Sequence, residues 1–142
     1  LLDLYSQRIG TIVHLPGLGI LCGGVFGSDA LLPQLAPGSD GSEELDALRL
    51  LARLVKGSRL QVYIPKWGSL AENGAEVLRR LANDVAYLHN LRRVIPALGE
   101  RADQQEHLAT VAASLLPAER ASSRNQTVNQ ANIRTVLAAA RP

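Results

Sequence analysis

The sequence has few of the residues that usually carry chemistry. Among 142 residues there are one cysteine, one tryptophan, one phenylalanine and no methionine. The single cysteine, Cys22, excludes an internal disulfide, and His14, His89 and His107 are too scattered to predict a zinc site. Because a reading frame begins with methionine, we expect the chain to be a fragment or a processed product of a longer protein.

A charge excess of one sign is lacking as well. Fifteen Lys and Arg residues against thirteen Asp and Glu give a net charge of +2. Residues 1–48 contain one base and six acids (net −5), and residues 49–142 contain fourteen bases and seven acids (net +7). Arg79 and Arg93 fall on one face of a predicted helix, but few aromatic residues accompany them. We therefore predict a solvated helix face and no nucleic-acid partner.

One long uncharged run, residues 9–28, has the length of a membrane span. It contains Pro16 and six glycines, which are incompatible with a stable helix. Asp3 precedes the run where a signal peptide would carry basic residues. We predict instead two buried strands, residues 11–15 and 19–25, joined by a tight turn that begins at Pro16. This interpretation favours a cytoplasmic protein without a membrane partner.

The remaining pattern predicts one further strand and four helices. A loop over residues 30–41 leads to a helix with apolar residues at helical spacing over 45–55, begun by Asp40 or Ser42 with Glu43. A short strand is expected over residues 59–65, where apolar and polar residues alternate.

Beyond Gly74 the pattern is helical. An apolar stripe predicts a long helix over residues 75–95, and Arg80 and Asp84 lie off that stripe, on the side predicted to face solvent. Capping boxes at Asp103 and at Thr127 predict where two more helices begin.

The order ββαβ followed by three helices predicts an α+β fold. Residues 1–142 would form a single domain or the C-terminal half of one, with a sheet part and one helix in 1–70 and a helical part in 71–142. Strands 11–15 and 19–25 are apolar at alternate positions on both sides, so we expect both faces of the sheet to be covered. A missing N-terminal segment or a second subunit would supply the other layer.

Motifs with catalytic or cofactor chemistry are weak. Gly17, Gly19 and Gly23 loosely imitate a dinucleotide fingerprint, but no helix is predicted to begin after them to receive a pyrophosphate. Cys22 lies among apolar strand residues and is predicted to be buried rather than nucleophilic. No Gly-x-Ser-x-Gly elbow or phosphate-binding Walker loop is present.

Two sequence segments resemble a known family. Residues 10–24, GTIVHLPGLGILCGG, are similar to a paired-strand segment of the metallo-β-lactamase superfamily, with its glyoxalase II-like hydrolase fold. Residues 62–68, VYIPKWG, resemble its strand that ends in Pro-Gly-His-Gly, and the intervening helix also fits the family's order of elements. The resemblance covers about residues 4–95. It implies a four-layer αββα sandwich, of which this chain would be the second half.

The resemblance also indicates where metal ligands would lie, and there the sequence departs from the family. Gln7 stands near the position of one histidine, Val25 (or Gly24) at the bridging aspartate, and Trp67 at the last histidine. Val and Trp offer no lone pair to zinc, so we expect no metal cofactor unless a missing segment supplies ligands. Asp29 is the possible substitute ligand, and Trp67 would plug the former metal pocket.

Three hypotheses about function follow. The first is a degenerate metallo-β-lactamase-fold protein that serves as a binding or structural scaffold and is expected to associate with itself or a partner. The second is an active metal-dependent hydrolase whose ligands come from a missing N-terminal segment. The third is a non-enzymatic α+β interaction module. No catalytic residue is assigned in this chain.

Overall fold

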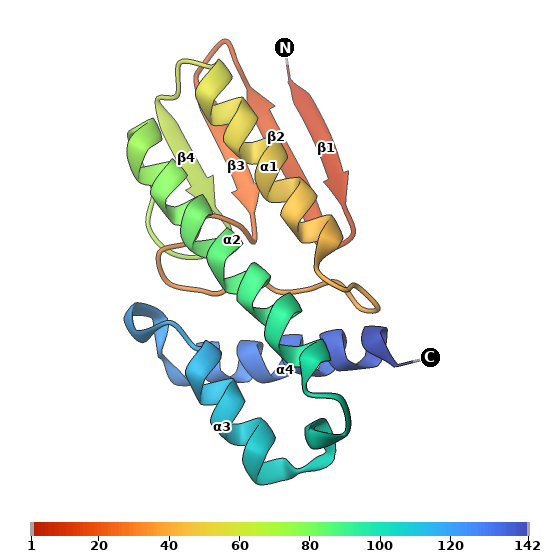
Figure 1. The fold of residues 1–142 in the computed structure, drawn as a ribbon. Helices are drawn as coiled ribbons and strands as arrows, with labels where there is room; N and C mark the ends of the chain where they lie inside the picture. The colour runs from red at the N-terminus through yellow and green to blue at the C-terminus, as the bar shows by residue number, and fades with distance from the viewer. Residues whose placement is uncertain (1, 142) are drawn as a thin grey trace.

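A computed structural model describes residues 2–141 and has an α+β fold in which four helices accompany a four-stranded mixed sheet (Figure 1). Two short 3-10 helices, η1 and η2, flank the third α-helix. In chain order the elements are β1 (Asp3–Gln7), β2 (Gly10–Leu15), β3 (Ile20–Gly24), α1 (Ser42–Gly57), β4 (Val62–Pro65), α2 (Gly74–Ala97), η1 (Gly99–Asp103), α3 (Gln105–Leu115), η2 (Ala118–Arg120) and α4 (Ser123–Ala140).

The strands lie in the order β1-β2-β3-β4. The first three form an antiparallel meander, and β4 pairs parallel with β3 after the crossover through α1. Because β1, β3 and β4 therefore run in the same direction, their carboxyl ends meet at one edge of the sheet (Figure 1). We call this edge the carboxyl edge.

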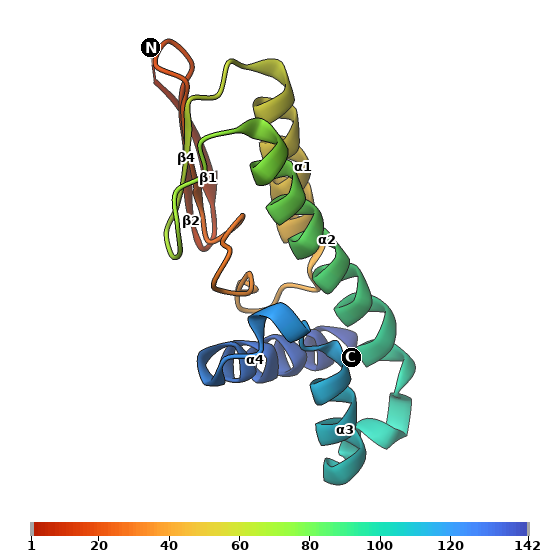
Figure 2. The ribbon, with the colours of Figure 1, turned by 90° about the vertical axis from the view of Figure 1, so that its left-hand side faces the viewer.

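The helices lie on one side of the sheet. Figure 2 shows the sheet edge-on, with α1 and α2 stacked against one face and α4 crossing beneath the carboxyl edge. Side chains that alternate along the strands enter the core between the layers, among them Ile12, Leu21 and Tyr63. They meet fully buried helix residues such as Leu51 and Leu88. One hydrophobic cluster continues from the sheet into α4.

The strands predicted over 11–15, 19–25 and 59–65 are confirmed, with bounds shifted by one to three residues. Strand β1 was not predicted, so the observed order is βββαβ before the later helices. The usual alternation of apolar and polar residues is obscured in β1. Its two apolar residues, Leu4 and Tyr5, are adjacent, and Leu4 is exposed while Tyr5 is half-buried. The helices expected over 45–55 and 75–95 lie within α1 and α2.

The predicted capping boxes are wrong. Helix α1 begins after Gly41, which has no side chain to cap it, while Asp40 accepts hydrogen bonds from Ser42. Asp103 ends η1 and bonds Arg141, so it does not cap α3. Thr127 lies inside α4, which begins earlier at the cap Ser122.

No helix in residues 2–141 is both long enough and apolar enough to span a bilayer.

Candidate functional site

The positions that the resemblance assigned to metal ligands lie at the carboxyl edge. Gln7 ends β1, Gly24 ends β3 with Val25 following it, and Trp67 comes two residues after β4. Strand β2 separates β1 from β3, so Gln7 is set apart from the other positions within the sheet.

The residues at this edge do not fit a hydrolytic zinc centre. Gly24, Val25 and Trp67 provide no side-chain lone pair for a metal, which leaves the weak ligand Gln7 and the carboxylate of Asp29. Across residues 2–141, no three His, Cys, Asp or Glu side chains are grouped closely enough to hold a metal ion. We therefore derive no metal-dependent step from this chain.

Trp67 does not plug the edge as predicted. Its side chain is 43% exposed, and the guanidinium of Arg124 on α4 lies 4.4 Å from the centroid of its ring. Beside Gln7, the buried Phe26 is one of the residues that line a cavity of only about 10 Å³. A cavity of that volume has room for at most one water molecule.

The glycine cluster has a structural explanation. The buried ring of Tyr63 lies where side chains on Gly23 or Gly27 would collide with it. The Tyr63 hydroxyl donates a 2.7 Å hydrogen bond to the carbonyl oxygen of Phe26. After β3 the next helix begins only at Ser42, so no helix N-terminus follows the glycines to bind a phosphate.

Asp29 is engaged in structural contacts. Its carboxylate accepts a 2.8 Å hydrogen bond from the backbone N–H of Ser69 and lies 3.6 Å from the guanidinium of Arg80. Burial raises the pKa of Asp29, but the hydrogen bonds from Ser69 and the charge of Arg80 outweigh it and lower the pKa overall. The Asp29 side chain therefore fastens the loop after β3 to the loop after β4.

Arg80 and Asp84 were predicted to face solvent, and that prediction is wrong. Arg80 is 5% exposed and donates 2.7 and 3.4 Å hydrogen bonds to the carbonyl oxygens of Ser69 and Gly27. Asp84 is fully buried and accepts a 2.8 Å hydrogen bond from the N–H of Gly27. The available signal was their spacing, because a cation and an anion four residues apart form a second, polar stripe on one helix face.

Asp84 also forms a buried ion pair with Arg120 of η2, at 2.8 Å between Oδ1 and Nη1. Burial raises the pKa of Asp84 to about 6, although the Arg120 charge and the Gly27 N–H act in the opposite direction. The Nε and Nη2 atoms of Arg120 are buried and have no hydrogen-bond partner within residues 2–141. The pair links α2 to the C-terminal helices behind the carboxyl edge.

The sheet face that points away from the helices is apolar. Cross-strand pairs place Val13 beside Cys22, and Cys22 beside Ile64, with their side chains on the same side. Cys22 was predicted to be buried, but it is only half-buried on this face. Among the described residues, no helix covers this side in Figure 2. We name it the outer sheet face, formed by Leu4, Val13, Leu15, Ile20, Cys22, Val62 and Ile64.

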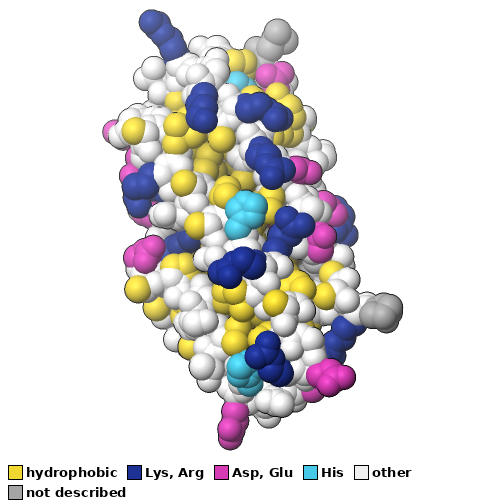
Figure 3. Space-filling view, in the orientation of Figure 1, with side chains coloured by type: hydrophobic (Ala, Val, Ile, Leu, Met, Phe, Trp, Pro, Cys, Tyr) yellow, Lys and Arg dark blue, Asp and Glu magenta, His cyan; other side chains and the backbone are white. Residues whose placement is uncertain are grey.

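Exposed apolar side chains continue beyond the outer sheet face. Trp67 and Leu70, in the loop after β4, are large hydrophobic residues that remain 43% and 56% exposed. Lys66 and Arg124 add positive charge next to them. The opposite side, formed by the helices, is not continuously apolar. Its Lys and Arg side chains are spread along it between apolar ones (Figure 3).

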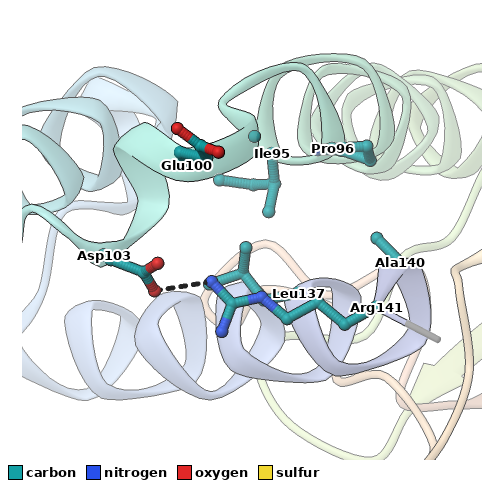
Figure 4. A pocket seen from close by; sticks show the side chains of 8 residues that line it. Ile95, Pro96, Glu100, Asp103, Leu137, Ala140 and Arg141 are labelled. Atoms are coloured by element: carbon teal, nitrogen blue, oxygen red, sulfur yellow. Dashed lines mark hydrogen bonds and ion pairs between the residues drawn. The ribbon is translucent and has the colours of Figure 1, made fainter.

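A separate pocket of about 320 Å³ lies where the ends of α2 and α4 meet η1 (Figure 4). Ile95 and Leu137 line its floor, and the ion pair between Asp103 and Arg141 crosses its rim at 2.8 Å. It contains none of the residues at the carboxyl edge.

No known family model, curated protein or solved structure matches this chain.

Proposed function

We propose that this chain is the second half of a metallo-β-lactamase-like sandwich without a competent metal centre, and that it acts as a binding scaffold. Its outer sheet face would receive a further β-layer, from a preceding segment of a longer chain or from a second subunit. The observation that carries this proposal is the outer sheet face itself, seven apolar strand residues on the side opposite α1 and α2.

The burial of apolar side chains explains why this face favours a partner. A sheet with one solvated face normally alternates apolar and polar residues, whereas β3 has Leu21 on its inner side and Ile20 and Cys22 on its outer side. Ile64 remains 36% exposed and Leu4 60% exposed. A second sheet stacked about 10 Å away would remove these side chains from water.

The carboxyl edge supports a scaffold rather than a hydrolase. The groups there are engaged with one another: Asp29 with Ser69 and Arg80, and Asp84 with Gly27 and Arg120. A general acid or base must instead reach a substrate proton.

Self-association tests the proposal on the chain alone. We expect concentration-dependent association in sedimentation equilibrium, which Ile64→Glu abolishes by placing a charge on the outer sheet face. Ala82→Glu is the matched control, because Ala82 is exposed on α2. Cys22, the sole thiol, reports the same face: maleimide labelling should be slow in the associated protein and fast in Ile64→Glu. A monomer at several hundred micromolar with a rapidly labelled Cys22 would exclude a second copy of this chain as the source of the further layer.

Metal content distinguishes the hydrolase hypothesis. Metal should be measured by plasma emission spectrometry after loading with zinc or manganese, on protein whose intact mass has been verified. We expect substoichiometric metal. Near-stoichiometric metal would mean that other residues rebuild a centre, and the hydrolase would then become the better proposal.

A further inference from the structure

Asparagines on α4 hold the long loop between β3 and α1 by its backbone. Asn125 is fully buried, and its Oδ1 accepts a 2.9 Å hydrogen bond from the N–H of Leu32. Its Nδ2 donates a 2.8 Å bond to the carbonyl oxygen of Ala30. One amide side chain thus binds a donor and an acceptor that lie two residues apart, as a neighbouring strand would.

The same arrangement recurs seven residues later. Asn132 accepts a 3.0 Å hydrogen bond from the N–H of Leu35 and donates a 2.8 Å bond to the carbonyl oxygen of Pro33. Seven residues are about two helical turns, so both asparagines project from the same side of α4. Figure 2 shows this loop lying directly above α4.

A third group holds the loop on the same side. Arg120, just before α4, donates a 3.3 Å hydrogen bond to the carbonyl oxygen of Leu31 and pairs with Asp84. Asp84 in turn binds the N–H of Gly27. We call Arg120, Asn125 and Asn132 the clamp, and residues 25–36 the clamped loop.

The clamp binds the loop backbone through polar groups, while Phe26, Leu32 and Leu35 of the clamped loop lie in the hydrophobic core. The buried residues of α4 are three asparagines and two aliphatic residues, Ile133 and Val136. Water can replace the amide hydrogen bonds when the clamp opens, so their net contribution is small. A buried ion pair such as Asp84–Arg120 also contributes little net stability, since desolvation offsets its attraction.

We propose that the clamp opens as one cooperative unit, releasing the clamped loop from α4 while the sheet, α1 and α2 remain folded. The clamped loop includes Phe26, which lines the cavity beside Gln7, and Asp29, which ties the loop to Ser69. Opening therefore uncovers the carboxyl edge of the sheet. The proposal concerns the chain by itself and does not depend on a partner for the outer sheet face.

Native-state hydrogen exchange tests this opening. The reporters are the amides of Gly27, Leu32 and Leu35, whose acceptors are Asp84, Asn125 and Asn132. We expect the three to share one protection factor, at least roughly tenfold lower than that of Leu88 within α2 and with a weaker dependence on denaturant. Exchange of all three only together with Leu88 would overturn the proposal, because the loop would then be freed only by global unfolding.

A variant tests cooperativity. Asn132→Ala removes the acceptor of the Leu35 N–H and leaves the hydrogen bond from the Leu32 N–H to Asn125 in place. If the clamp opens as a single unit, hydrogen exchange of the Leu32 amide should accelerate by the same factor as that of the Leu35 amide, roughly tenfold. Acceleration confined to Leu35 would overturn the proposal. Asn90→Ala, at an exposed position on α2, should leave both amides unchanged. If the variant does not fold, the comparison of these amides with Leu88 in the wild-type protein still tests whether the clamp opens separately from the rest of the fold.

Discussion

The sheet half and the C-terminal half of this protein are held together by different forces. Between the sheet and helices α1 and α2, the core is mainly hydrocarbon, such as Leu21, Leu48 and Leu88. The buried charges of α2, Arg80 and Asp84, bind the loop after β3. Along α4, three of the five buried residues are asparagines. Hydrocarbon burial is non-directional and provides bulk stability, whereas paired amides specify one path of the backbone. The comparison suggests that the sheet half supports the fold and α4 shapes the loop at the carboxyl edge.

The largest effect should come from the hydrocarbon side. Leu51 of α1 is fully buried, so Leu51→Ala should lower the free energy of unfolding by about 4 kcal/mol. Urea unfolding followed by circular dichroism measures the change. Leu54→Ala, at a half-buried position on the same helix, is the matched control with a smaller expected loss. A loss below about 1 kcal/mol for Leu51→Ala would mean that the hydrocarbon core is not the main source of stability.

The next largest loss of stability should come from breaking the ion pair between the two halves. Arg120→Met leaves the buried Asp84 carboxylate without its cation and should cost about 3 kcal/mol at pH 7. Adding Asp84→Asn removes the unpaired charge and retains an acceptor for the Gly27 N–H, so the double variant should regain part of that loss. Urea unfolding of both variants provides the measurement. A double variant less stable than Arg120→Met would show that the carboxylate is stabilising without its partner.

The pH dependence of stability should sharpen the comparison. The pKa of Asp84 is about 6 in the folded protein, above its ordinary value near 3.9, so the folded state binds more protons between these values. Its contribution is therefore fully present below about pH 4 and is lost as the pH rises through 6. Relative to Asp84→Asn, the wild type should lose about 2 kcal/mol between pH 4 and 7 in urea unfolding. Parallel pH profiles of the two proteins would contradict this.

The sequence predicts the sheet side better than the α4 side. Alternating apolar residues and a Pro-Gly turn define β2 and β3, and an apolar stripe defines α2. These signals succeed because hydrophobic periodicity records which face is buried. Asn125 and Asn132 produce no such signal, since an asparagine in a helix is ordinarily read as exposed or as a cap. Their partners lie more than ninety residues away in the sequence.

The candidate site was predictable only in part. The resemblance placed Gln7, Val25 and Trp67 at positions that the fold brings to one edge of the sheet. The burial of Arg80 and Asp84 was missed because the stripe counted hydrophobic residues alone, and charged residues are rarely buried unless paired. The contact of Trp67 with Arg124 joins the loop after β4 to a helix far along the chain. Such pairings are tertiary and leave no trace in local spacing.

The smallest effect should come from a polar residue on the hydrocarbon side. His14 projects from β2 into the core and is 6% exposed, and neither ring nitrogen has a hydrogen-bond partner within residues 2–141. The nearest charge is a carboxylate oxygen of Asp3, 3.8 Å from Nδ1. Unlike the asparagines of α4, His14 loses its contact with water on folding and gains no hydrogen bond in return.

His14→Leu should therefore raise the free energy of unfolding by about 1 kcal/mol, measured at pH 7.5 in urea. His89→Leu, at an exposed position on α2, is the control and should change stability by less than about 0.5 kcal/mol. A destabilised His14→Leu variant would mean that the contact with Asp3 holds β1 against β2. The sheet half would then depend on a directional polar contact, as α4 does, and the contrast between the two halves would be one of degree.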